Sequence, residues 1–276
     1  MTSVAASSRV GMARTLNELI PADREGDALR APGREAITYA ELRRAVREIA
    51  GGLAELGVGT GDRVGILSTT RPEWVLADLG TISTGATVVP VYHTNSPEEC
   101  EHVLGHSGTR VAFVEDADQA AKIAQVRDAL PALKHIIVIE GTVEGAITLT
   151  ELRAMGARHG EAIVTVAPED PVTIVYTSGT TGPPKGCVLT HANLLSVIEA
   201  SAERLRMWDA PPVIFLYLPL AHVLARLSAL VAIATGGTLV FWSGDRERLA
   251  AELAEAAPTY VPTVPVSYTH LTLPTN

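Results

Sequence analysis

The apolar residues of the chain recur at helical spacing in several segments, and the first clear example lies just after residue 38. One face of this predicted helix is formed by apolar residues three or four positions apart: Leu42, Val46, Ile49, Leu53 and Leu56. Thr38 and Glu41 precede this face at the spacing of a capping box, and Gly57 follows it where a helix commonly ends. The pattern therefore predicts an amphipathic helix that packs one face against a core.

Other segments carry short apolar runs, many of them rich in valine and isoleucine, that predict buried strands. These runs occupy residues 63–67, 86–92, 111–115, 135–140, 172–176, 187–190, 213–219 and 238–242. Helical signals lie between them: capping boxes at Thr70–Glu73 and Ser96–Glu99, each with a proline in the first turn, and segments 117–128, 150–157, 191–205, 222–235 and 246–256. Strands that alternate with helices predict an α/β fold with mostly parallel sheets covered on both faces.

Turn-forming and polar residues concentrate between 141 and 170, and this stretch predicts a boundary between two α/β subdomains. The first subdomain would occupy residues 14–150 and the second residues 151–265. Residues 1–13 are mostly small or polar and are predicted to be frayed. The final segment, VSYTHLTLPTN (266–276), breaks the expected helix pattern, and we interpret it as a non-native tail.

Composition changes this picture only by excluding some functions. Hydrophobic residues make up 47% of the 276 residues, enough for a sizeable core, and the net charge of −9 disfavours binding to nucleic acid. The two cysteines predict reduced thiols, and the first twenty residues lack the pattern of an export signal. The longest uncharged apolar stretch, 227–242, is interrupted by two glycines and is short for a membrane span. We therefore predict a cytoplasmic protein and leave open peripheral contact with the inner membrane face.

The stretch YTSGTTGPPKG (176–186) concentrates glycines, hydroxyl side chains and one lysine between two predicted strands. Glycines let the backbone turn so that several N–H groups point inward, and the hydroxyls and Lys185 add donors and a positive charge. This combination suits a polyphosphate, whereas the alternative is a plain surface turn. The loop differs from the common NTPase pattern, because Lys185 is flanked by Pro184 and Gly186 and a strand follows it.

The segment YTSGTTGPPKGCVLTH (176–191) resembles the signature of the adenylate-forming superfamily, without a gap. Such enzymes join a carboxylate to the α-phosphate of ATP and release pyrophosphate, and most then pass the acyl group to a thiol. The resemblance implies that the following residues hold the β- and γ-phosphates: Thr177, Ser178, Gly179, Thr180, Thr181, Gly182 and Lys185. Mg²⁺ would assist in neutralising the charge that moves onto pyrophosphate. The chain would then be an incomplete large N-terminal domain of such an enzyme.

A second segment, LPLAHVLAR (218–226), is similar to one that places a histidine beside the acyl and nucleotide sites in this superfamily. His222 stands at that position and is the candidate substrate-site residue. From the residues alone, a histidine near a helix N-terminus that bonds to a local backbone group is the simpler interpretation. The resemblance does not imply an acid–base role, because a carboxylic acid is already ionised at neutral pH.

Three further segments resemble the first half of long-chain fatty acyl-CoA synthetases: TRPEW (70–74), VVPVYHTNSPEE (88–99) and LGHSGTRVAFVED (104–116). This branch implies a ligase of lipid metabolism whose substrates are a fatty acid, ATP and coenzyme A. Two alternatives stay open, namely an enzyme that adenylates a medium-chain, aryl or amino-acid carboxylate, and a non-catalytic nucleotide-binding module. The acyl-chain length and the oligomeric state are not predicted.

The sequence also departs from this superfamily. We find no Y-G-x-T-E segment, no ribose-binding aspartate and no C-terminal domain with a catalytic lysine, so we expect a truncated half that binds ATP weakly and does not turn over. Cys100, His102 and His106 could suggest a metal site, but a solvated helix end is the favoured interpretation. Arg43, Arg44 and Arg47 are likewise interpreted as the solvated face of their helix.

Overall fold

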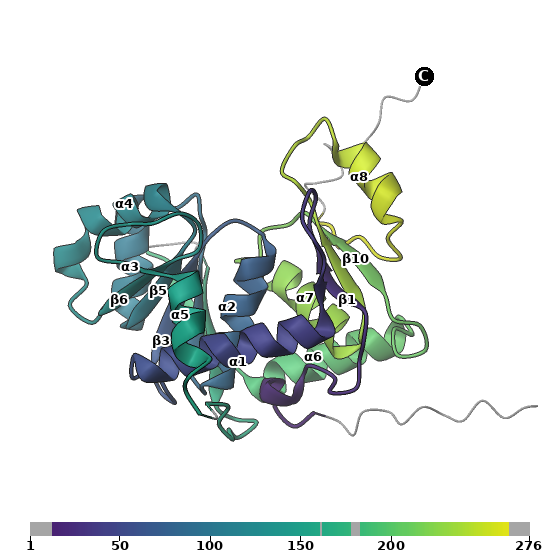
Figure 1. The fold of residues 1–276 in the computed structure, drawn as a ribbon, viewed down its shortest axis with the longest axis horizontal. Helices are drawn as coiled ribbons and strands as arrows, with labels where there is room; N and C mark the ends of the chain where they lie inside the picture. The colour runs from purple at the N-terminus through teal and green to yellow at the C-terminus, as the bar shows by residue number, and fades with distance from the viewer. Residues whose placement is uncertain (1–12, 161, 178–182, 265–276) are drawn as a thin grey trace, which may run out of the picture.

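The computed structural model describes residues 13–160, 162–177 and 183–264, and its strands form two sheets (Figure 1). Within these residues, one sheet has seven strands in the order β7 (Ile147–Thr148), β6 (His135–Val138), β5 (Val111–Val114), β3 (Arg63–Leu67), β4 (Thr87–Val91), β8 (Pro171–Thr177) and β9 (Lys185–Thr190). The other has four, in the order β10 (Val213–Leu216), β11 (Thr238–Phe241), β1 (Asp27–Arg30) and β2 (Ile37–Thr38).

Both sheets are mostly parallel, as the alternation of strands and helices predicts. In the seven-stranded sheet every neighbouring pair is parallel except β8 with β9. In the four-stranded sheet β11 pairs in parallel with both β10 and β1, and β2 is antiparallel to β1. The predicted fold class is confirmed.

Helices cover both faces of the seven-stranded sheet, and the alternation of side chains along its strands explains how. In β5, Val111 and Phe113 belong to the larger core beneath α1 (Tyr39–Glu55), α2 (Pro72–Ser83) and α5 (Leu149–Gly156), whereas Ala112 and Val114 belong to a second core. The second core lies under α3 (Pro97–Ser107) and α4 (Ala117–Gln125). Successive residues of a strand point to opposite faces, so a fully apolar strand contributes side chains to the cores on both faces of the sheet.

The larger core continues between the two sheets. There α2 lies between them in Figure 1, and all twelve of its residues are buried. The other helices are α6 (His191–Arg204), α7 (Val223–Ala234) and α8 (Leu249–Ala256), with short 3₁₀ turns at Leu16–Glu18 and Arg127–Ala129. No helix in the described part of the chain combines the length and the apolar character needed to cross a membrane.

Two of the three predicted capping boxes are confirmed, and the third is wrong. Thr38 with Glu41 and Ser96 with Glu99 each make both reciprocal bonds. By contrast, Arg71 is the N-cap residue of α2, and no side chain caps that helix end. The hydroxyl group of Thr70 is instead bonded to residues 218 and 220. Partners that are distant in sequence have therefore replaced the local bond that the Thr70–Glu73 spacing predicts.

The two sheets do not divide the chain at residue 150. Strands β8 and β9 follow that position but complete the seven-stranded sheet, while β1 and β2 precede it and complete the four-stranded sheet. The predicted ranges 14–150 and 151–265 therefore do not coincide with the two sheets. The predicted tail, 266–276, and all but the last residue of the predicted frayed segment 1–13 lie outside the described residues.

Candidate functional site

The glycine-rich loop joins two antiparallel strands, as its sequence predicts. Thr177 at the end of β8 lies opposite Lys185 at the start of β9, and Tyr176 lies opposite Gly186. Both Thr177 and Lys185 are exposed. The predicted site residues Ser178, Gly179, Thr180, Thr181 and Gly182 lie outside the described residues. The structure therefore brings the first and last predicted phosphate-binding residues together at one end of a hairpin.

The environment of Lys185 suits an anionic ligand. Among the described residues no carboxylate lies within ion-pair distance of its ammonium group. Backbone hydrogen bonds of the β8–β9 pair fix where its side chain starts. A lysine of this kind acts as a point charge for phosphate, and the Thr177 hydroxyl on the facing strand is a second donor.

His222 occupies the N-cap position of α7, where its exposed ring accepts a hydrogen bond from the backbone of the same helix. The N–H group of Leu224 donates to Nδ1 of His222 at 3.2 Å. This is the local role that the residues alone predict. An Nδ1 atom that accepts must be unprotonated, so the proton of the neutral ring is on Nε2. The ring therefore presents one N–H donor away from the helix end.

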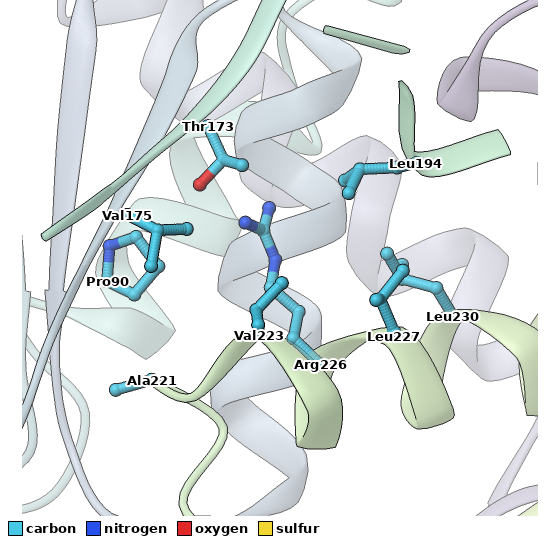
Figure 2. Close-up of a pocket in the computed structure, with 9 residues that line it drawn as sticks. All are labelled: Pro90, Thr173, Val175, Leu194, Ala221, Val223, Arg226, Leu227 and Leu230. Carbon is cyan, nitrogen blue, oxygen red and sulfur yellow. The ribbon is translucent and has the colours of Figure 1, made fainter. Parts of the chain in front are cut away.

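The neighbours of His222 meet the strand that leads into the loop. Ala221 and Val223 line a cavity of about 10 Å³ together with Thr173 and Val175 of β8. Figure 2 shows these side chains, with Arg226 pointing from α7 into the space next to β8. A space of this size holds about one water molecule, so it is a packing gap and not a substrate pocket. The shared lining shows that the segment around His222 and the strand that leads into the glycine-rich loop are neighbours in the fold.

A buried ion pair, which the motifs did not reveal, fixes α7 against α2. The guanidinium group of Arg226 donates to both carboxylate oxygens of Asp78, at 2.9 and 2.6 Å, and lies 5.9 Å from the ring centre of Trp74. Burial raises the pKa of Asp78, and the charge of Arg226 opposes that rise. Part of the signal is present in the sequence, because Arg226 is the lone charge within the otherwise apolar helix α7.

A second tether joins the segment before His222 to the end of β3. The hydroxyl group of Thr70 donates to the carbonyl oxygen of Leu218 and accepts from the N–H group of Leu220, both at 2.9 Å. The TRPEW and LPLAHVLAR segments are therefore parts of one structural unit. This contact explains why a threonine stands at position 70 although it caps no helix.

A network of charges lies beside this tether, near the carboxyl ends of β3, β5 and β6. Arg71 contacts Glu73 at 2.9 Å, Glu115 at 3.2 Å and Glu140 at 2.9 Å. Arg34 also donates to Glu73. Burial opposes ionisation of Glu73, but the bonds from Arg34 and Arg71 outweigh it and lower the pKa of Glu73 to about 2.

The network makes the stability of the protein depend on pH. The pKa of Glu73 falls from 4.5 to about 2 on folding, so its contribution is present above the unfolded value and is lost as the pH falls through the folded value. Between about pH 5 and pH 2 we expect a loss of about 3 kcal/mol from this group. Glu73→Gln should flatten the dependence in urea titrations across this range. The exposed Glu144→Gln is the matched control, and parallel curves for Glu73→Gln and wild type would contradict the assignment.

Two other interpretations from the sequence concern the histidines of α3 and the arginines of α1. His102 contacts the loop through Pro184, and His106 contacts it through Tyr176, so the two rings do more than form a solvated helix end. Arg43 donates to the carbonyl groups of Pro21 and Arg24, while Arg44 lies near a glutamate on its own helix. Within the described ranges no three histidine, cysteine or acidic side chains gather in a metal-binding arrangement.

Comparisons with known proteins agree on one family. A family model described as AMP-binding enzyme matches residues 22–275. The chain is 39% identical over 235 residues to the long-chain-fatty-acid–CoA ligase FadD15 of Mycobacterium tuberculosis, which covers 83% of this chain and 39% of that protein. It is 30% identical over 246 residues to the peroxisomal long chain acyl-CoA synthetase 6 of Arabidopsis thaliana, covering 85% of this chain and 35% of that protein.

Solved structures show the same fold. The long-chain-fatty-acid-CoA ligase FadD1 from Archaeoglobus fulgidus matches with a TM-score of 0.85 at 24% identity, over 94% of this chain and 54% of that one. ATP-bound MatB from Rhodopseudomonas palustris matches with a TM-score of 0.81 at 24% identity, over 95% and 52% of the two chains. At these identities the likeness is one of fold. The chain spans well under half the length of the curated relatives that it matches.

Proposed function

The chain belongs to the AMP-binding enzyme family, and from that premise we propose that it serves the ATP-dependent conversion of a long-chain fatty acid to its coenzyme A thioester. A fatty-acid carboxylate oxygen attacks the α-phosphorus of ATP, forming an acyl-adenylate and releasing pyrophosphate. The thiol of coenzyme A then attacks the acyl carbon and releases AMP. Because the chain covers 39% of the FadD15 relative, the complete activity is proposed for the protein at its full natural length.

The observation that carries this proposal is the hairpin end at which Thr177 faces Lys185. Attack of a carboxylate on a phosphate brings two anions together, and negative charge then builds on the departing pyrophosphate. In the proposal, Lys185 and Thr177 hold the β- and γ-phosphates together with Ser178, Gly179, Thr180, Thr181 and Gly182. Mg²⁺, when bound to ATP, supplies further charge neutralisation.

The proposed role of His222 is donation of a hydrogen bond to a substrate oxygen. Its Nδ1 atom is engaged with Leu224, which leaves the Nε2–H group to face a ligand. No base is required at this position, because the fatty acid reaches the site already ionised. His222 would then orient the acyl or phosphate oxygen while the helix end holds its ring.

Variants of His222 separate this role from capping. Asparagine is a strong N-cap residue, so His222→Asn should keep the stability of α7. It cannot place a donor where Nε2 lies, and we expect kcat/KM for adenylate formation to fall about tenfold, the value of one hydrogen bond. His222→Ala should lose both activity and stability. Steady-state kinetics with urea unfolding checks this, and full activity in His222→Asn would leave only the capping role.

The choice of substrate is tested by a carboxylate profile. Pyrophosphate release is measured with fatty acids of increasing chain length, an aryl acid and an amino acid, with ATP, Mg²⁺ and coenzyme A present. The proposal expects the highest kcat/KM with long-chain acids. A preference for medium-chain, aryl or amino acids would keep the adenylation chemistry and overturn the substrate class.

We also propose the cytoplasm as the location, with peripheral contact at the inner membrane face. The two cysteines support a reducing compartment, because Cys100 is a buried free thiol and Cys187 an exposed one. A long-chain fatty acid partitions into membranes, which supports contact with a lipid surface. Fractionation of cells with antibody detection would check both statements.

A further inference from the structure

Two histidines one turn apart on α3 contact the two ends of the glycine-rich loop. His102 Nε2 lies 2.8 Å from the carbonyl oxygen of Pro184, and His106 Nδ1 lies 2.7 Å from the hydroxyl oxygen of Tyr176. Tyr176 immediately precedes Thr177, and Pro184 immediately precedes Lys185. Each histidine therefore bonds to a residue that directly precedes one of the residues proposed to bind phosphate.

The three rings form one packed cluster. The two imidazole rings are stacked with centres 5.7 Å apart, and Tyr176 stands edge-on to both, at 6.0 Å from His102 and 5.7 Å from His106. Aromatic pairs with such geometry are favourable beyond their buried area. The helix thus holds β8 and the start of β9 by hydrogen bonds and by ring packing together.

The carbonyl group of Pro184 fixes the direction of the bond from His102. A carbonyl oxygen only accepts, so Nε2 of His102 must carry the proton and donate to Pro184. Burial raises the pKa of Tyr176, so its hydroxyl stays protonated and either donates to Nδ1 of His106 or accepts from it, according to the ring tautomer. The hydroxyl of Tyr176 and the carbonyl of Pro184 are therefore both hydrogen-bonded to α3.

Two simpler interpretations fit less well. A metal site would need further ligands, and the described residues provide no third histidine, cysteine or acidic side chain beside the two rings. Ordinary helix-end chemistry would direct the rings to the backbone of α3, whereas both hydrogen-bond partners lie 70 or more residues away in sequence. The contacts are specific to the two ends of the loop.

We propose that His102 and His106 are positioning residues, which hold Tyr176 and Pro184 so that Thr177 and Lys185 face the polyphosphate of ATP. This inference rests on the proposed function. Displacement of a binding group by a fraction of its hydrogen-bond length weakens the bond steeply. Loss of either histidine should therefore lower the affinity for ATP and pyrophosphate and leave the affinities for fatty acid and coenzyme A unchanged.

The test compares His102→Leu with His102→Gln, and His106→Leu with His106→Asn. Glutamine can place an amide N–H near the position of Nε2, and asparagine can place an oxygen near the position of Nδ1. We expect KM for ATP to rise about fivefold to twentyfold in the leucine variants, as for one lost hydrogen bond and a shifted group. KM for the fatty acid should stay within about twofold, and the amide variants should recover most of the loss. His159→Leu, at a partly exposed histidine near Glu55, is the matched control.

A binding measurement separates this inference from the proposed function. Calorimetric titration of the 276-residue chain with pyrophosphate and with ATP and Mg²⁺ needs no turnover, and urea unfolding confirms that each variant is folded. Weaker binding in the leucine variants with recovery in the amide variants supports the inference. Equal binding in all variants overturns it and leaves the proposed function standing. A wild-type chain that binds neither ligand overturns the proposed phosphate site and this inference with it.

Discussion

Replacing Arg226 by alanine is expected to lower the free energy of unfolding by about 3–5 kcal/mol, the range measured when one partner of a buried ion pair is removed. Arg226 and Asp78 are only 3% and 2% exposed. The substitution would leave the carboxylate of Asp78 buried between the sheets without its two guanidinium bonds. It would also remove the cation that lies over Trp74.

A double-mutant cycle tests whether this cost comes from the pair itself. Asp78→Ala alone should be similarly destabilising, because it leaves an unpaired guanidinium group. The double variant Asp78→Ala with Arg226→Ala should be less destabilised than the sum of the two single variants, since no buried charge remains. Urea unfolding followed by tryptophan fluorescence gives the three values. A loss below about 1 kcal/mol in Arg226→Ala would show that water reaches the site and that the pair is not buried.

Replacing Lys185 by alanine is expected to slow adenylate formation by about a hundredfold to a thousandfold, the cost of removing one preorganised electrostatic group at a transition state. The lysine is proposed to meet charge that grows on the departing pyrophosphate, so the loss should be larger in kcat than in the affinity for ATP. Lys185→Arg keeps the charge but changes the shape of the donor, and we expect an intermediate rate.

The measurement for Lys185 is pyrophosphate release in the first turnover, with the fatty acid and ATP saturating. Lys134→Ala is the matched control, because Lys134 is also an exposed lysine and directly precedes β6, which three strands separate from the β8–β9 hairpin. The control should retain the wild-type rate. A rate within about threefold of wild type in Lys185→Ala would show that Lys185 is not part of the proposed phosphate-binding site.

Local sequence patterns predicted most of the elements, because those patterns depend on neighbours along the chain. The face of α1 and its capping box need only residues within a few positions, and both are present. The short strands β1, β2 and β7 were not predicted. They contain two to four residues each, and β1 joins its sheet through β11, which lies about two hundred residues later, as well as through β2.

The candidate site was predicted in part for the same reason. The loop is a continuous motif, so its residues could be named, and the strand pairing follows from the runs on either side. The contacts of Thr70, Arg226 and the α3 histidines join segments far apart in sequence. No spacing rule predicts them, although a lone charge in the apolar helix α7 indicates that Arg226 needs a partner.

The most direct test of the proposed function is fatty-acid-dependent exchange of labelled pyrophosphate into ATP by the protein at its full natural length. This exchange reports reversible formation of the acyl-adenylate and needs no coenzyme A. The account predicts exchange that requires both Mg²⁺ and a long-chain fatty acid and that is lost in Lys185→Ala. Saturable ATP binding without exchange, whichever carboxylate is supplied, would contradict it and identify a nucleotide-binding module without adenylation chemistry.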